Sequence, residues 1–136
     1  MTVDFSLLEN AVARLDEGLD RYRRDTSDAQ IRDGLIQRFE FTYDIAHKAL
    51  RLVLAEASAT PDLIDRMSFP TLIRTADEQG LLKSDWTVWH RFRQMRNITS
   101  HSYDEAKALE VTRDIPAFLD EARELVLRLT QGRTGD

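Results

Sequence analysis

A row of apolar residues near the C-terminal end, repeating every three or four positions, constrains the fold more than any other feature of this chain. The row comprises Ile115, Phe118, Leu119, Ala122, Leu125, Val126 and Leu129. Such spacing places side chains on one face of an α-helix, and that face must be buried against other helices. The row therefore predicts a helix within a bundle. Asp104 can cap this helix at its start, and Pro116 predicts a break or kink near Asp114.

The composition agrees with an all-α fold in a single domain. The 136-residue chain contains five Gly and three Pro, and residues that favour helices dominate it. This length is enough for one hydrophobic core, so we expect one domain over residues 1–136. The chain has no Cys, no long apolar run and no signal peptide, and we therefore expect a cytoplasmic protein that does not attach to a membrane.

The apolar periodicity predicts an antiparallel up-down bundle of four to five helices. The first helix is expected over residues 5–22 and the second over residues 31–54. The second has apolar residues on more than one face, which is typical of a central helix or of one covered by a second subunit. Ser27, followed by Gln30, resembles a capping box at its start.

The middle of the chain is expected to hold a loop and two shorter helices. Two prolines predict a connecting loop over residues 59–70, and a short helix should follow over residues 71–79 and stop at Gly80. Ser84 or Asp85 can cap the next helix.

That next helix carries polar residues on the side opposite its expected core row. The core row is Val88, Phe92 and Met95. At about 100° per residue, His90, Asn97 and His101 lie roughly 160° from that row. They are therefore expected to face water or another subunit.

Charge is distributed unevenly along the chain. The net charge is -5, which argues against broad non-specific binding to nucleic acid. Residues 83–101 instead contain four Lys or Arg and two His against the single acid Asp85. This stretch predicts either a local site for an anion or an ordinary solvated helix face.

The basic stretch leads into the sequence Arg96-Asn97-Ile98-Thr99-Ser100-His101-Ser102-Tyr103, called here the Arg–His motif. Arg offers a permanently charged fork of donors, and His can give or take a proton near neutral pH, so both suit the binding and cleavage of a phosphodiester. An Arg and a His at this spacing arise by chance roughly one time in three, whereas the additional Tyr lowers this to about one per cent. The three residue types together therefore indicate a functional site.

Arg96, His101 and Tyr103 resemble the signature of the HEPN domains, which is an Arg, four to six further residues and a His, often with a Tyr two positions later. The chain is still more similar to the subfamily of nucleotidyltransferase substrate-binding proteins. That similarity is carried by the motif and by Gln37 to Tyr43, Ala46, Lys48 and residues 70–82. His47 stands where many relatives carry Trp.

The resemblance implies a HEPN-type antiparallel bundle and a homodimer whose two motifs line a shared cleft. It also implies a partner, a minimal nucleotidyltransferase encoded nearby, in a toxin–antitoxin module. Many HEPN proteins resemble metal-independent ribonucleases, so RNA cleavage without a cofactor is implied. In related pairs the nucleotidyltransferase silences its partner by adding AMP to the motif Tyr, which is Tyr103 here.

Arg96 and His101 are the expected catalytic residues. In RNA cleavage His101 would be the general base toward the 2′-OH or the general acid toward the leaving oxygen, and Arg96 would stabilise charge on the phosphate. One His cannot easily do both jobs, whereas a dimer supplies two. The alternative is that both side chains satisfy helix-end carbonyls or form a salt bridge within a dimer.

Other residues are assigned to the surroundings of the motif. Asn97 and Arg93 are expected to bind phosphate, although Asn97 can equally bond the ribose or end the helix. Tyr103 can stack on a base, accept AMP or cover the motif. Trp86 and Trp89 are expected to be core or dimer contacts rather than platforms for bases.

Glu40 and Asp44 lie four residues apart and so share a face of the second helix. They are expected either to support the motif by orienting Arg96 or Arg93, or to form an ordinary intramolecular salt bridge. The His residues show no metal-ligand clustering, so no metal is expected.

Two functions remain after these considerations. The first is a ribonuclease toxin; the second is a non-catalytic subunit that binds nucleotide or substrate for the nucleotidyltransferase. The chain has neither a Gly-rich phosphate loop nor the Asp-x-Asp pair with which a nucleotidyltransferase holds its metals. We therefore expect it to be the partner of that enzyme rather than the enzyme itself.

Overall fold

The computed structural model describes residues 3–134, with side chains to residue 131, and every regular element in this range is helical. The elements are α1 (Ser6–Arg24), α2 (Ala29–Glu56), α3 (Pro61–Asp65), α4 (Phe69–Glu78), α5 (Trp86–Ile98), the 3₁₀ turn η1 (Thr99–His101) and α6 (Glu105–Thr134). The all-α expectation is confirmed. The described residues form six α-helices rather than four to five, because α3 forms within the expected loop.

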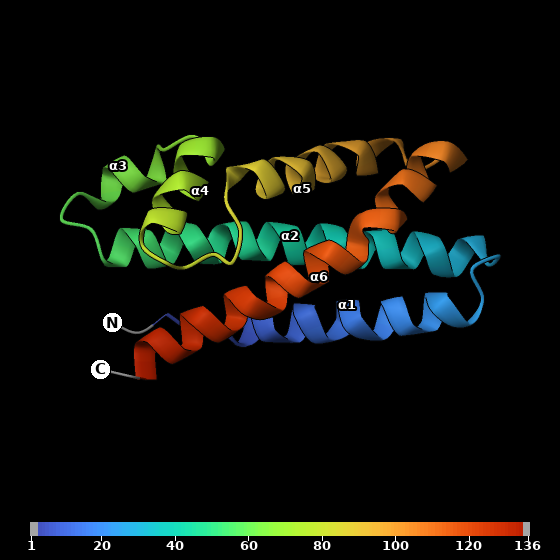
Figure 1. Ribbon diagram of the computed structural model, residues 1–136, viewed down its shortest axis with the longest axis horizontal. Coiled ribbons are helices and arrows are strands. Elements are labelled where there is room, and N and C mark those ends of the chain that lie inside the picture. Colours follow the sequence, from blue (N-terminus) through green and yellow to red (C-terminus); the bar gives the residue numbers. More distant parts are fainter. Residues whose placement is uncertain (1–2, 135–136) are drawn as a thin grey trace.

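The long helices form a bundle in which α2 is central. α1 and α2 lie side by side and antiparallel, and α6 crosses them diagonally (Figure 1). α5 packs on α6 along the other side of the bundle, while α3 and α4 pack at one end of α2. α2 therefore contacts α1, α3, α4 and α6, as expected for the central helix. None of the described helices is long and apolar enough to cross a membrane.

α6 buries the apolar row that dominates the sequence. Ile115 and Phe118 are fully buried, and Phe118 meets Phe39 and Phe92 edge-on at ring-centroid distances of 4.9 and 5.2 Å. Each such side chain contributes about 1.5–3 kcal/mol on burial, which offsets the roughly 3 kcal/mol that a proline costs inside a helix. α6 accordingly continues through Pro116, so of the expected break or kink the break does not occur.

The other two prolines begin helices instead of interrupting them. Pro61 and Pro70 lie in the first turns of α3 and α4. A proline is tolerated there because the first N–H groups of a helix have no partner within that helix. The expectation of a loop over residues 59–70 is therefore wrong in part, and α4 begins at Phe69 rather than at residue 71. Gly80, with φ +75°, follows the end of α4 and agrees with the expected stop.

Aspartates cap the three helices whose starts matter most. Asp28 accepts a hydrogen bond of 3.0 Å from a backbone N–H in the first turn of α2, so the cap expected from Ser27 is wrong by one residue. Asp85 and Asp104 accept equivalent bonds of 3.0 and 2.9 Å at the starts of α5 and α6, which confirms both expected caps. These two caps fix the boundaries of the segment that contains the Arg–His motif.

Candidate functional site

The residues of α5 that face the core differ from the expected ones, and as a result Arg96 lies closer to α2 than the expected core row implies. Trp89, Phe92 and Met95 are at most 2% exposed, whereas Val88 is 37% exposed. The indole of Trp89 removes far more apolar surface from water than Val88 would, so α5 turns toward the tryptophan. The prediction that Val88 belongs to the core row is therefore wrong, and Arg96 lies close to α2 with its side chain only 30% exposed.

Arg96 is held by two carboxylates of α2. Its Nε donates to Asp44 Oδ1 at 3.0 Å and its Nη2 donates to Asp44 Oδ2 at 3.1 Å, which is a bidentate pair. Glu40 Oε2 lies 3.4 Å from Nη1 of the same guanidinium. The hydrogen bonds that Arg96 donates to the Asp44 carboxylate raise the pKa of Arg96. Glu40 and Asp44 thus each form an ion pair with Arg96, and not with Arg93.

Thr99 completes this arrangement and was not identified from the sequence. It is 4% exposed; its Oγ1 accepts a hydrogen bond of 3.0 Å from Arg96 Nη1 and donates one of 2.6 Å to the backbone carbonyl of Arg96. Three of the five N–H donors of the guanidinium are used in hydrogen bonds, and Nη1 also lies 3.4 Å from Glu40 Oε2, so the second N–H of Nη2 is the donor left without a partner among the described residues. A Thr three positions after an Arg on a helix was the available signal, because such residues are neighbours on the helix surface.

His101 and Tyr103 face solvent on the turn that follows α5. The His101 ring forms no hydrogen bond with any other described residue, so both of its nitrogens are available. Tyr103 is 86% exposed, and its ring lies edge-on to His101 with centroids 6.1 Å apart. Because Tyr103 is so exposed, its hydroxyl can be reached from solvent, and it does not cover the buried part of the site. The motif therefore combines a fixed Arg with an unpaired His.

The two expected phosphate-binding residues lie on the same side of α5. Asn97 is exposed, and only its backbone carbonyl takes part in a bond of the motif, from the Ser100 hydroxyl. Arg93 is half-buried with its guanidinium carbon 5.4 Å from the centroid of the Phe69 ring. It has no carboxylate partner among the described residues, unlike Arg96.

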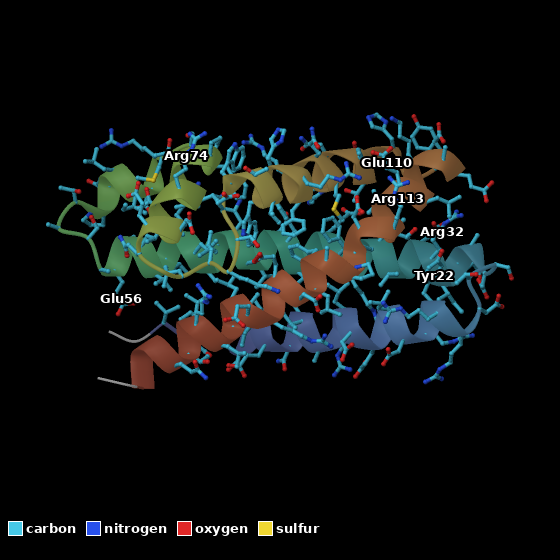
Figure 2. The ribbon with its side chains drawn as sticks, in the orientation of Figure 1. Tyr22, Arg32, Glu56, Arg74, Glu110 and Arg113 are labelled. Atoms are coloured by element: carbon cyan, nitrogen blue, oxygen red, sulfur yellow. The ribbon has the colours of Figure 1, made fainter. Side chains whose placement is uncertain are left out.

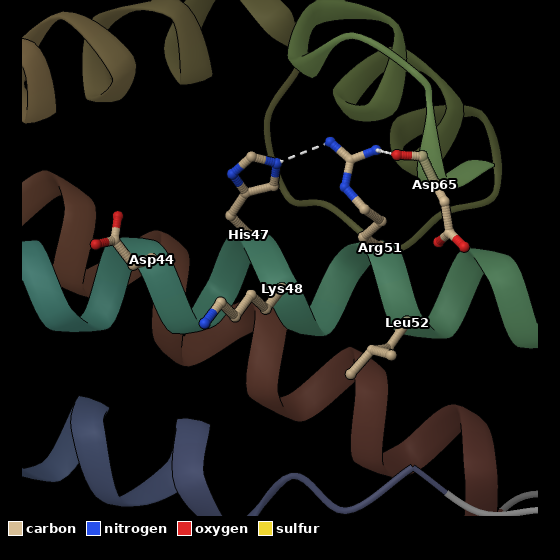
Figure 3. Close-up of a pocket in the computed structure, with 6 residues that line it drawn as sticks. All are labelled: Asp44, His47, Lys48, Arg51, Leu52 and Asp65. Carbon is tan, nitrogen blue, oxygen red and sulfur yellow. Dashed lines mark hydrogen bonds between the residues drawn. The ribbon is translucent and has the colours of Figure 1, made fainter. Parts of the chain in front are cut away.

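A pocket of about 520 Å³ adjoins the site (Figure 3). Its lining consists of Asp44, His47, Lys48, Arg51, Leu52 and Asp65. Arg51 donates to the carbonyl of Ile64 at 2.7 Å and lies 3.1 Å from His47 Nε2. Burial lowers the pKa of His47, and Arg51 lowers it further. Asp44 alone among the expected site residues lines this pocket, so it connects the pocket with Arg96.

The described residues show no cluster of three or more His, Asp or Glu side chains that could hold a metal ion. The polar groups around the motif are instead arranged in Arg–carboxylate pairs. Among the side chains of the motif, an imidazole such as that of His101 suits proton transfer, and a guanidinium such as that of Arg96 suits charge stabilisation.

The all-helical bundle carries a fixed Arg and an exposed His and Tyr at the end of one helix, which agrees with the HEPN-type domain expected from the sequence. Residues 3–131 match the family model described as "Nucleotidyltransferase substrate binding protein like", and the chain belongs to this family. The family expected from the sequence is thereby confirmed.

A curated protein and a solved structure, both from Haemophilus influenzae, are similar to this chain. A curated protein named "Probable ribonuclease HepT" is 39% identical over 98 residues, which are 72% of this chain and 66% of that protein, slightly less than two thirds. A solved structure, described as the fold of a substrate binding domain of a nucleotidyltransferase, superposes with a TM-score of 0.88 at 32% identity. It covers 94% of this chain and 100% of the solved chain. The two descriptions correspond to the two functions that the sequence left open.

Proposed function

We propose that this protein is the HEPN component of a two-protein module with a minimal nucleotidyltransferase, and that it cleaves RNA without a metal ion. The observation that carries this proposal is the combination of Arg96, held by the Asp44 carboxylate, with an unpaired, exposed His101 five residues later. A phosphate needs a fixed cation, and a proton transfer needs an accessible base. The name of the curated relative supports the same activity.

The proposed reaction follows from the two side chains. His101 removes the proton of a ribose 2′-OH, and the 2′ oxygen attacks the adjacent phosphorus. The bond from phosphorus to the 5′ oxygen breaks, and that oxygen receives a proton from His101 of a second copy of this protein. The products are a 2′,3′-cyclic phosphate and a 5′-OH. The guanidinium of Arg96, through the N–H of Nη2 that the protein leaves unused, stabilises the charge that develops on the phosphate.

A homodimer is part of this proposal because one His cannot serve as both base and acid in the same step. α2 carries exposed apolar side chains, with Phe41 56% and Leu52 58% exposed. They lie about 100° around the helix from Glu40 and Arg51, which belong to the Arg96 site and its adjoining pocket. The proposed dimer has a second copy covering Phe41 and Leu52, with the two motifs meeting across the same interface. Light scattering of the purified protein should show a dimer at micromolar concentration.

Tyr103 is the proposed target of the nucleotidyltransferase. Its hydroxyl would attack the α-phosphorus of ATP, form a Tyr–AMP bond and release pyrophosphate, with the phenolic proton passing to solvent. The exposure of Tyr103 supports access by a partner enzyme. Because its ring adjoins His101, an attached AMP would occupy the space that RNA needs and add negative charge there.

The second candidate function is a non-catalytic subunit that binds nucleotide for its partner. The pocket beside Asp44 favours it, because Lys48 and Arg51 line a volume of about 520 Å³. The description of the solved relative supports this reading as well.

One experiment distinguishes the two functions. Purified protein is incubated with end-labelled RNA in excess EDTA, alone or after treatment with the neighbouring nucleotidyltransferase and ATP. The ribonuclease proposal expects cleavage by the untreated protein, a 2′,3′-cyclic phosphate end, and loss of cleavage when the mass of Tyr103-containing peptides rises by one AMP. Binding of RNA or nucleotide with no cleavage under any condition would support the second function instead.

A further inference from the structure

One face of α5 presents aromatic, cationic and amide side chains. Trp86, His90, Arg93 and Asn97 follow one another at steps of four, three and four residues, which places them on a single helix face. Residues 86–98 contain no Asp or Glu, although the chain as a whole has a net charge of -5. This face ends at the turn that carries His101.

Two arginines on this surface lack an acidic partner. Arg93 lies over the Phe69 ring at 5.4 Å, and Arg74 of α4 lies over the Trp86 ring at 5.9 Å, measured from guanidinium carbon to ring centroid. Neither makes an ion pair or a hydrogen bond within the described part of the chain. Figure 2 shows Arg74 on the outer side of α4, near the start of α5. Their guanidinium groups are positioned by aromatic rings, yet their N–H donors remain free for an oxyanion.

Aromatic rings connect these cations. The Trp86 ring centroid lies 6.0 Å from that of Phe69 and 5.3 Å from that of His90. Phe69 is buried, whereas Trp86 is half-buried and His90 is exposed, so the outer edge of this row is accessible. Trp89 is a core residue as expected, but Trp86 is not fully enclosed by the core. An accessible indole beside free guanidinium groups is suited to a base and its phosphate.

We propose that Arg74, Trp86, His90, Arg93 and Asn97 form a binding track for single-stranded RNA, called here the α4–α5 track, which leads the strand to His101. The inference rests on the proposed ribonuclease function and adds the form of its substrate. Arg74 and Arg93 bind phosphates, and Trp86 and His90 stack on bases. Unpaired bases are required because only a single strand exposes base faces to aromatic side chains.

The dimensions of the track suit a short stretch of RNA. At about 1.5 Å of rise per residue, the eleven steps from Trp86 to Asn97 span roughly 16 Å. Stacked nucleotides repeat at about 3.4 Å along a strand, so this length accommodates a few of them. The absence of acids from residues 86–98 means that no carboxylate on α5 itself repels the phosphates.

The test measures binding separately from cleavage. A fluorescent single-stranded RNA is titrated against protein that carries His101→Ala, so that the RNA stays intact. Arg74→Gln combined with Arg93→Gln removes two track cations. The control is Arg23→Gln combined with Arg24→Gln, which removes the same charge from exposed positions at the end of α1. Trp86→Ala removes the stacking ring, and Trp86→Phe retains a ring.

The track predicts a distinct result for each variant. The double track variant should raise Kd about tenfold or more, and it should reduce the slope of log K against log salt by about 1.4, because each lost single-strand phosphate contact contributes about 0.7. Trp86→Ala should raise Kd about tenfold without changing the slope, and Trp86→Phe should recover most of the affinity. The control pair should change Kd by less than about twofold.

Several outcomes would overturn the track. The first is that the track pair and the control pair have equal Kd values for RNA. The second is that the track pair changes the mass of the dimer and leaves the RNA affinity unchanged. The third is that the track pair no longer binds the nucleotidyltransferase and leaves the RNA affinity unchanged. The last two would assign the surface to a second copy or to the partner protein. Wild-type protein that binds RNA through the track but never cuts it would retain the track and refute the ribonuclease. If the track variants cleave RNA as fast as the wild-type protein, the ribonuclease is retained and the track is refuted.

Discussion

Two arginines of α5, five residues apart, are held in nearly the same way on opposite sides of the helix. Arg96 pairs with Asp44 and Glu40 on α2, and Arg91 pairs with Asp114 and Glu110 on α6. In both cases the two acids are four residues apart, and the arginine side chain is about one third exposed, at 30% and 32%. An arginine bound by two carboxylates is therefore not, by itself, a sign of function in this molecule.

The two sites differ in what surrounds the guanidinium. Arg91 directs both Nε and Nη2 to a single oxygen of Asp114, at 2.8 and 2.6 Å, and ties α5 to α6. Arg96 uses both oxygens of Asp44 and a further bond to Thr99, so its plane is fixed at three points. Only Arg96 is followed by an unpaired His on the next turn. Under the proposed function, Thr99 and His101 are the additions that distinguish the Arg96 site from an otherwise ordinary ion pair.

The largest expected effect follows from His101→Ala. If His101 transfers protons, its loss should lower the rate constant for RNA cleavage by about 10²- to 10⁴-fold. The side chain is exposed and has no hydrogen-bond partner among the described residues, so the free energy of unfolding should change by less than about 0.5 kcal/mol. Single-turnover cleavage and urea denaturation measure the two quantities. If this variant cleaves RNA as fast as the wild-type protein, His101 is not catalytic, and its presence no longer distinguishes the Arg96 site from the Arg91 site.

A smaller effect is expected from Thr99→Val. Valine retains the shape of threonine but cannot accept the bond from Arg96, so the guanidinium becomes less well fixed. We expect cleavage to slow by about tenfold and stability to fall by about 1 kcal/mol.

Thr112→Val provides the matched control. Thr112 is 6% exposed, and its hydroxyl also donates to a carbonyl three residues earlier, that of Leu109 at 3.1 Å, but it forms no hydrogen bond with an arginine of the described residues. It should lose similar stability and keep normal cleavage. Equal activity in the two Val variants would show that Thr99 does not position Arg96.

Much of this arrangement was predictable from the sequence, but the partners of each arginine were not. The apolar row of α6, the caps Asp85 and Asp104, and the shared face of Glu40 and Asp44 all follow from local spacing. The assignment of Glu40 and Asp44 to Arg96 depends on how far α5 turns. That rotation is decided by the burial of Trp89 against other helices, which periodicity within α5 does not reveal.

Tertiary packing also explains the remaining errors. Pro116 is accommodated because buried residues on both sides of it hold α6 together, and local rules do not include that stabilisation. The role of Thr99 became visible only with the guanidinium in place, because it depends on the orientation of Arg96. A threonine in this position would otherwise be taken as a residue that bonds its own backbone.

The smallest expected effect concerns Glu121, a glutamate of α6 that forms no ion pair with an arginine of the described residues. It is 4% exposed, and its oxygens make no hydrogen bond of standard geometry among the described residues, although the Ser84 side chain is near enough to interact with it. Burial raises the pKa of Glu121 against smaller opposing effects of Ser84 and Lys83. A folded state with a raised pKa binds more protons than the unfolded state, so this group's stabilisation is complete below its unfolded pKa and is lost as pH rises through the folded pKa.

Glu121→Gln should remove that pH dependence and stabilise the protein relative to wild type as pH rises. Urea denaturation between pH 4 and 8 measures this. Glu124→Gln is the control, because Glu124 is half-exposed and pairs with Arg128 at 3.0 Å. If the stability of Glu121→Gln depends on pH as that of the wild-type protein does, the pKa of Glu121 does not change on folding.

The most direct test of the central claim compares Arg96→Ala with Arg91→Ala in one RNA cleavage assay, with urea denaturation of both proteins. The two ion pairs are similarly exposed, so each variant should lose about 1 kcal/mol of stability. Arg96→Ala should cleave about 10²- to 10³-fold more slowly, whereas Arg91→Ala should stay within about threefold of wild type. Equal losses of cleavage in the two variants, or normal cleavage by Arg96→Ala, would contradict the assignment of Arg96 to catalysis.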